Sequence, residues 1–227
     1  MIGVMPDDVS RVPLPAVVLA TRVVVMLPAV GVAELIAPVQ VLIQEGLRAF
    51  SLPATGARPG ELRAVFAARG CFGVHDVRDI AQARQAIAEG AEFASSLGAP
   101  QAVDLLVAAE VPTLVGALTP GEVARAWADP VSAVQVVPAG VFGNSYAAHL
   151  VALLPDIALT TRGADSSYEA RVWLAAGARA VFVADKLLGD SIGGGDLAGL
   201  RLRARPYLEA ALTGDNETLR HESAQSV

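Results

Sequence analysis

Glu45-Gly46-Leu47-Arg48-Ala49-Phe50 joins the end of an apolar helical segment to the start of a buried strand. A glycine directly after a helix accepts the left-handed backbone conformation that ends the helix and turns the chain into the next element. The same order of a glycine, a small or apolar residue and a strand returns at 89–93 and at 176–182. This repeated junction predicts a chain in which helices and strands alternate.

Short apolar runs near these junctions are typical of strands that are buried on both faces. They recur at intervals of roughly 20 to 25 residues, which leaves room for one helix in each gap. The runs are Val23–Leu27, Ala49–Leu52, Cys71–Val74, Glu92–Ser95, Thr113–Gly116, Ala133–Val137, Ile157–Thr161 and Ala180–Ala184. The pattern predicts the α/β class and a single (β/α)8 TIM barrel. An open doubly wound sheet is the alternative, but it needs a Gly-rich phosphate turn, and Leu27–Gly31 is not one.

Two helix starts carry a capping-box pattern, at Thr119-Pro120-Gly121-Glu122 and at Ser166 followed by Glu169. In this pattern the first side chain accepts from the backbone of the third helical residue, and the acidic side chain returns the bond. We expect the barrel, with an N-terminal lead-in, to occupy residues 1–212. A last helical stretch should end at Leu212, and residues 213–227 should form a polar tail.

Composition excludes several classes of function. The net charge of −6 and the pI of about 5.1 argue against nucleic acid, which requires a basic surface. The single cysteine, Cys71, fits a reducing cytoplasm. In the apolar stretch Val12–Ala33, Arg22 and three prolines interrupt any membrane span. A hydrophobic content of 53% exceeds what one barrel needs, and we expect a homo-oligomer.

The segment Val111–Val123, with Thr119-Pro120-Gly121-Glu122 at its end, resembles a signature of the 2-keto-3-deoxy-6-phosphogluconate and 4-hydroxy-2-oxoglutarate aldolases. Gln135-Val136-Val137-Pro138-Ala139 is similar to that family's Lys-Phe-Phe-Pro-Ala, and Ala91–Ser96 to its Ala-Gln-Phe-x-x-Ser. The similarity extends over about Val23–Leu188. It implies an aldolase-type barrel, a small anionic 2-oxo acid as substrate, no cofactor or metal, and a trimer or larger assembly.

The departures from the family pattern concern its chemistry. The family's Schiff-base lysine corresponds to Gln135, whose amide nitrogen cannot form an imine. Its proton-transferring glutamate corresponds to Ser51, a poor general base unless activated. The glycine-rich phosphate loops of the family correspond to Thr161-Arg162-Gly163 and Ala184-Asp185-Lys186. The resemblance therefore predicts a diverged member without the lysine-dependent mechanism, in which Arg162 and Lys186 hold an anion by charge.

Active sites of such barrels lie at the carboxyl ends of the strands. The candidates for catalysis there are Lys186, Ser51, His75 and Asp76, and the candidates for substrate binding are Gln135, Thr161, Arg162, Ser96 and Asn144. Burial would make Lys186, the only lysine, nucleophilic. A salt bridge to Asp185 or to a carboxylate of the eighth helix is the alternative.

His75 backed by Asp76 fits a general base. Adjacent strand residues point to opposite faces, so at most one of the two should enter the barrel. In the alternative, Asp76 caps the next helix and His75 lies on the surface. Asn144, likewise, either binds substrate oxygens or caps a helix.

Two functions remain open from the sequence. One is a lyase that acts on a small 2-oxo acid by a rebuilt mechanism. The other is a non-catalytic barrel that serves as a structural, assembly or ligand-binding subunit, because both inherited catalytic groups are missing. No metal-binding motif is present.

Overall fold

A computed structural model describes residues 10–56 and 58–224. Its strands are β1 (Val23–Met26), β2 (Ala49–Pro53), β3 (Cys71–Val77), β4 (Ala94–Ser96), β5 (Thr113–Ala117), β6 (Ala133–Val136), β7 (Leu159–Arg162) and β8 (Ala180–Val183). They are parallel and pair in chain order into one closed barrel, in which β8 returns to β1. The predicted (β/α)8 barrel is confirmed.

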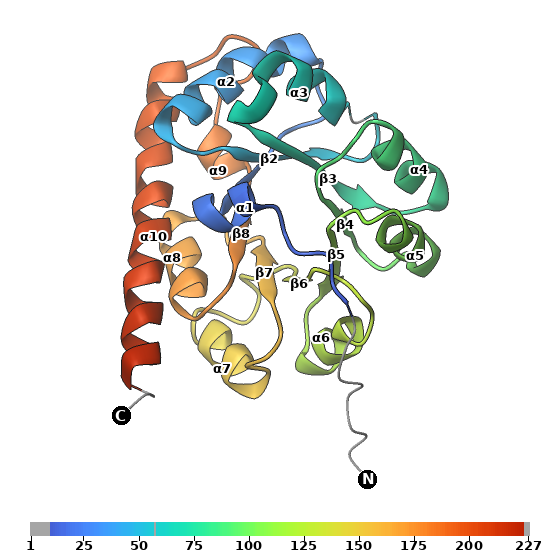
Figure 1. The fold of residues 1–227 in the computed structure, drawn as a ribbon. Coiled ribbons are helices and arrows are strands. Elements are labelled where there is room, and N and C mark those ends of the chain that lie inside the picture. Colours follow the sequence, from blue (N-terminus) through green and yellow to red (C-terminus); the bar gives the residue numbers. More distant parts are fainter. Residues whose placement is uncertain (1–9, 57, 225–227) are drawn as a thin grey trace.

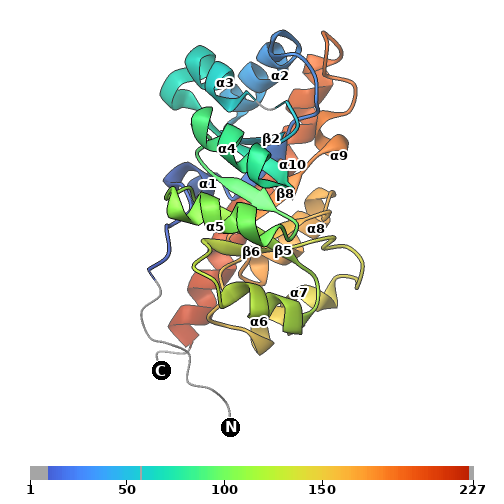
Figure 2. The same cartoon turned by 90° about the vertical axis from the view of Figure 1, so that its right-hand side faces the viewer.

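The helices are α1 (Ala16–Thr21), α2 (Val32–Glu45), α3 (Pro59–Phe66), the 3-10 turn η1 (Ala67–Arg69), α4 (Ile80–Ala88), α5 (Pro100–Ala108), α6 (Pro120–Trp127), α7 (Ser145–Leu153), α8 (Ser167–Ala175), α9 (Asp185–Leu188) and α10 (Leu197–Ala224). Most of them form a ring around the strands, as Figures 1 and 2 show from two directions, whereas α1 lies over one end of the barrel. The helix α10 packs along α8 and α2 and so completes the ring.

The helix-ending glycines and the capping boxes adopt the conformations that the sequence predicts. Gly46 and Gly177 both have a left-handed backbone, with φ of 110° and 111°, at the junctions that lead into β2 and β8. The capping boxes that begin at Thr119 and Ser166 are both formed, at the starts of α6 and α8. These junctions and caps set where the chain leaves each helix and enters the next strand.

One predicted boundary is wrong. The last helix does not end at Leu212 but continues to Ala224, so most of the segment interpreted as a polar tail is helical. A helix that is already established tolerates the isolated Gly214 where the sequence indicated an end. Residues 225–227 of that segment lie outside the described residues.

Apolar side chains form two cores, one on each face of the strands. The larger core fills the space between the strands and the outer helices. The smaller one lies inside the barrel and includes Val24, Phe93 and Phe182, with Leu14 and Val18 from the region of α1. The helix α1 therefore closes the amino-terminal end of the barrel, and only the carboxyl-terminal end can serve as a mouth.

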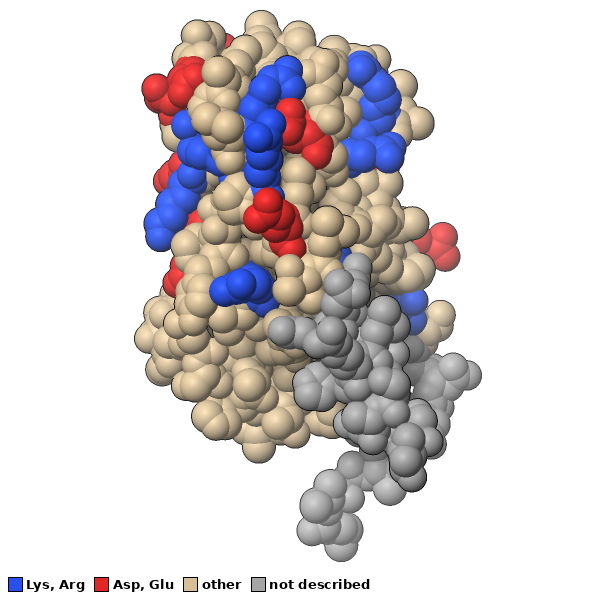
Figure 3. Space-filling view, turned by 90° about the vertical axis from the view of Figure 1, so that its left-hand side faces the viewer, with Lys and Arg blue, Asp and Glu red and all other residues tan. Residues whose placement is uncertain are grey.

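The surface on the α10 side carries mixed charges. Blue and red side chains alternate there without a large patch of one sign (Figure 3). One of its ion pairs joins Arg201 of α10 to Glu45 at the end of α2, with 2.8 Å between Nη1 and Oε1. In the described part of the chain, no helix has the length and apolar character needed to cross a membrane.

Candidate active site at the barrel mouth

Interior positions of the strands form layers, because alternate residues of each strand point inward and the strands are staggered. The strand registers place Ser51, Ser95, Gln135 and Phe182, from the even-numbered strands, in one layer. The layer above, nearer the mouth, is contributed by the odd-numbered strands and contains Met26, His75, Gly116 and Arg162. The upper interior of the barrel is therefore polar, whereas its lower part is apolar.

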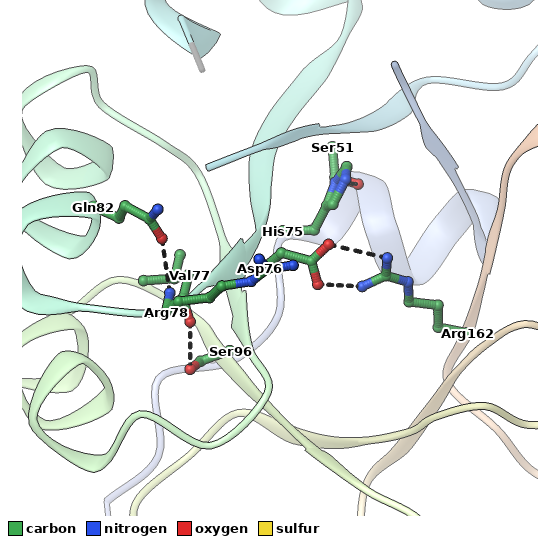
Figure 4. Close-up of polar contacts among 8 residues, drawn as sticks. All are labelled: Ser51, His75, Asp76, Val77, Arg78, Gln82, Ser96 and Arg162. Carbon is green, nitrogen blue, oxygen red and sulfur yellow. Dashed lines mark hydrogen bonds and ion pairs between the residues drawn. The ribbon is translucent and has the colours of Figure 1, made fainter. Parts of the chain in front are cut away.

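Ser51 and His75 form a hydrogen-bonded pair on neighbouring strands. The Ser51 Oγ lies 3.0 Å from the His75 Nδ1 (Figure 4). Both side chains are buried, with 0% and 6% exposure. Burial lowers the pKa of His75 to about 4, and the charge of Arg162 adds to this effect, while Asp76 and Ser51 oppose it. The imidazole is consequently neutral near pH 7, the form that can accept a proton.

Asp76 and Arg162 form a bidentate ion pair at the mouth of the barrel. The guanidinium Nη1 and Nη2 of Arg162 donate to the two carboxylate oxygens of Asp76 at 2.5 and 3.1 Å. These residues come from β3 and β7, which lie on opposite sides of the closed barrel, so the pair crosses the mouth (Figure 4). Burial alone would raise the pKa of Asp76, but the hydrogen bonds and charge of Arg162 hold it below its usual value.

A bulge in β3 makes this arrangement possible. The pairing of β3 with β4 shifts between Val74 and Val77, and Asp76 has a φ of 60°. A bulge re-aims the side chains around it. His75 and Asp76 therefore both face groups at the mouth, and the expectation that at most one of them enters was wrong. The alternative that placed His75 on the surface was also wrong, and the residue that caps α4 is Asp79.

Gln135 is fully buried in the polar layer, across the barrel from Ser51. Neither its Oε1 nor its Nε2 has a hydrogen-bond partner in the described structure. The hydroxyls of Ser95 and Thr160 are buried and unpartnered as well. Gln135 pairs in register with Thr160 on β7. Buried polar groups normally have hydrogen-bond partners. Gln135, Ser95 and Thr160 therefore form a candidate site for a ligand or for ordered water.

Two predicted binding residues point away from the barrel interior. Thr161 alternates with the inward Thr160 and Arg162, so its buried hydroxyl faces the outer helices. Ser96 alternates with the inward Ser95, and its Oγ donates to the Val77 carbonyl at 2.7 Å. Sequence reasoning missed Ser95 and Thr160. The period of two was the available signal, since Arg162 inside the barrel implies Thr160 rather than Thr161.

The last two predicted residues, Lys186 and Asn144, lie outside the polar layers of the barrel interior. Lys186 is exposed on α9, so the burial that would make its amine nucleophilic is absent. The expected salt bridge from Lys186 is also absent among the described side chains. Asn144 is exposed before α7 and makes no side-chain cap. No group of three or more His, Cys, Asp and Glu side chains in the described residues could hold a metal ion.

No protein-family model and no curated protein matches this sequence. Several solved structures are similar to it. A 4-hydroxy-2-oxoglutarate/2-dehydro-3-deoxyphosphogluconate aldolase from TTHB1 is 27% identical, with 86% of this chain and 97% of that chain covered and a TM-score of 0.74. A cube-shaped protein cage designed by fusing symmetric oligomeric domains is 18% identical, with coverages of 90% and 77% and a TM-score of 0.77.

A tryptophan synthase structure from M. tuberculosis is 17% identical, with 90% of this chain and 99% of that chain covered and a TM-score of 0.65. The two matches below 20% identity support the barrel fold alone. The aldolase from TTHB1, at 27% identity, further supports an aldolase-like barrel.

Proposed function

We propose that this barrel is an aldolase-type carbon–carbon lyase for a small 2-oxo acid, and that His75 transfers the proton without a Schiff base. The observation that carries the proposal is the buried Ser51–His75 pair, at 3.0 Å, in the upper interior layers that also hold Gln135. The similarity to the aldolase from TTHB1 and the sequence resemblance support this substrate class.

The neutral imidazole can act as the base through its second nitrogen. When Nδ1 of His75 donates to the Ser51 hydroxyl, the lone pair lies on Nε2, and no described side chain or backbone group bonds to that nitrogen. Ser51 then acts as a positioning residue that holds the ring and selects the tautomer.

One proton carried by His75 is enough to balance the reaction. His75 accepts the proton of the 4-hydroxyl of a 4-hydroxy-2-oxo acid, and the C3–C4 bond breaks as the C4 carbonyl forms. The electron pair of that bond passes to the 2-oxo oxygen and gives an enolate. The Nε2 of Gln135, unpartnered in the free protein, donates a hydrogen bond to this oxyanion. The imidazolium then protonates C3, which releases the shorter 2-oxo acid and returns His75 to its neutral form.

The upper layer provides the group that would bind the substrate carboxylate. The planar guanidinium of Arg162 matches a carboxylate in bidentate geometry. It stands in the same interior layer as His75, directly above the layer of Gln135. The charged guanidinium at the mouth and the neutral amide below it match the carboxylate and the adjacent 2-oxo group of such a substrate.

The test is release of pyruvate from 4-hydroxy-2-oxo acids, followed with purified variants. H75N, whose amide can still meet Ser51, and Q135L should lose turnover, while K186M should keep it. Borohydride treatment in the presence of pyruvate, followed by mass spectrometry, should leave the protein unmodified. A covalent adduct on Lys186, or turnover that survives in H75N, would contradict the proposed route.

A non-catalytic barrel is the second candidate. The observation that favours it is the Asp76–Arg162 ion pair, which crosses the mouth above polar groups that are fully buried. We also propose a homo-oligomer, a trimer or larger. Exposed Val141, Phe142 and Leu153, at 51 to 65% exposure, support this assembly, as does the similarity to a cage built from oligomeric domains. Light scattering that shows a monomer at micromolar concentration would refute the assembly.

A further inference from the structure

Asp76 has a backbone conformation that needs a specific reason. A φ of 60° is uncommon for residues other than glycine, although Asp and Asn adopt it more readily than most. Such conformations gather at binding and active sites, where the surrounding structure holds them. Here the bulge in β3 directs the carboxylate across the mouth rather than along the strand. The local backbone therefore serves the contact with Arg162.

The contact has the geometry of a bound carboxylate ligand. Both oxygens of Asp76 accept from the two terminal nitrogens of Arg162, at 2.5 and 3.1 Å. The two side chains keep 18% and 24% exposure, so solvent reaches the pair at the rim. Below the rim, Gln135 and Ser51 have no exposure and His75 has 6%. A ligand that comes from solvent thus meets this ion pair before it meets the buried polar layer.

We propose that Asp76 is a specificity-determining residue, a resident carboxylate that a ligand carboxylate must replace on Arg162 before the ligand enters the barrel. This inference rests on the proposed function, because it takes Arg162 as the carboxylate site. When a ligand carboxylate replaces Asp76, Arg162 exchanges one bidentate contact for another of the same shape and charge. An uncharged ligand gains no such contact, so the ion pair excludes it and admits small carboxylates.

Binding of pyruvate, measured by calorimetry, tests the exchange without any need for turnover. D76N keeps a residue that tolerates the positive φ but removes the competing charge. It should bind pyruvate about tenfold more tightly than the unmodified protein, since the ligand no longer displaces an anion. Methyl pyruvate, which lacks the carboxylate, should show no such gain. R162Q should abolish pyruvate binding in both backgrounds.

The control is E45Q, which removes the partner of Arg201 in a surface ion pair on another part of the barrel. It should leave pyruvate binding unchanged. If folded D76N binds pyruvate no more tightly than the unmodified protein, or if neither binds it, the exchange is refuted. A tenfold gain without lyase activity in any variant would sink the proposed reaction and leave the exchange in place. Turnover in the unmodified protein, with no tighter pyruvate binding in D76N, would refute the exchange and leave the proposed reaction in place.

Discussion

Substituting His75 by Asn tests the electrostatics of the barrel interior directly. The buried imidazole has a pKa of about 4, whereas its ordinary value is 6.5. Above pH 6.5 the ring is neutral in both the folded and the unfolded protein, so it causes no penalty. As the pH falls below 6.5, the unfolded chain binds a proton that the folded protein does not bind. The folded state therefore loses stability until the pH reaches about 4.

The size of the effect follows from the shift. A difference of about 2.5 pKa units corresponds to about 3 kcal/mol of unfolding free energy at 1.36 kcal/mol per unit. The loss should proceed at up to about 1.4 kcal/mol per pH unit between pH 6.5 and 4. H75N lacks the titrating ring. Between pH 6.5 and 4, its free energy of unfolding should therefore fall by about 3 kcal/mol less than that of the unmodified protein.

Urea denaturation at several pH values between 7.5 and 4 measures the free energy of unfolding of both proteins. The difference between their curves isolates His75 from the carboxylates, which titrate in both. H149Q, which removes an exposed histidine of α7, is the matched control and should follow the unmodified protein. Parallel curves for H75N and the unmodified protein, or an NMR titration of His75 with a midpoint near 6.5, would show that burial does not lower the pKa of this ring.

Four further substitutions probe the strands of the barrel. Q135L removes an unpartnered buried amide and should raise the free energy of unfolding by about 1 kcal/mol in urea denaturation; a loss of 2 kcal/mol would mean that the amide has partners. S96A should cost about 1 to 2 kcal/mol, because its hydroxyl serves two backbone groups, whereas S95A should cost almost nothing. Equal costs would overturn the assigned strand faces. G73A should cost about 1 to 3 kcal/mol, since its new methyl would lie 2.5 Å from the Phe93 ring, and an unchanged melting temperature would contradict that contact.

Much of the fold was predictable because its signals are local. Gly46 and Gly177 mark helix ends, and the boxes at Thr119 and Ser166 mark helix starts, through contacts within a few residues of the chain. Their regular recurrence between apolar runs was enough to predict a closed barrel. The candidates Ser51, His75, Gln135 and Arg162 also follow from sequence, because the carboxyl ends of parallel strands converge.

Which side chains meet was decided by the tertiary structure. Sequence reasoning selected Ser96 and Thr161 where Ser95 and Thr160 face inward, because a shift of one residue reverses the face of a strand. It also did not predict the bulge at Asp76, which depends on how β3 pairs with β4. The ion pair across the mouth joins strands that are distant in the chain and opposite in the barrel. Local periodicity determines which elements form, whereas closure of the barrel determines which of their residues share a site.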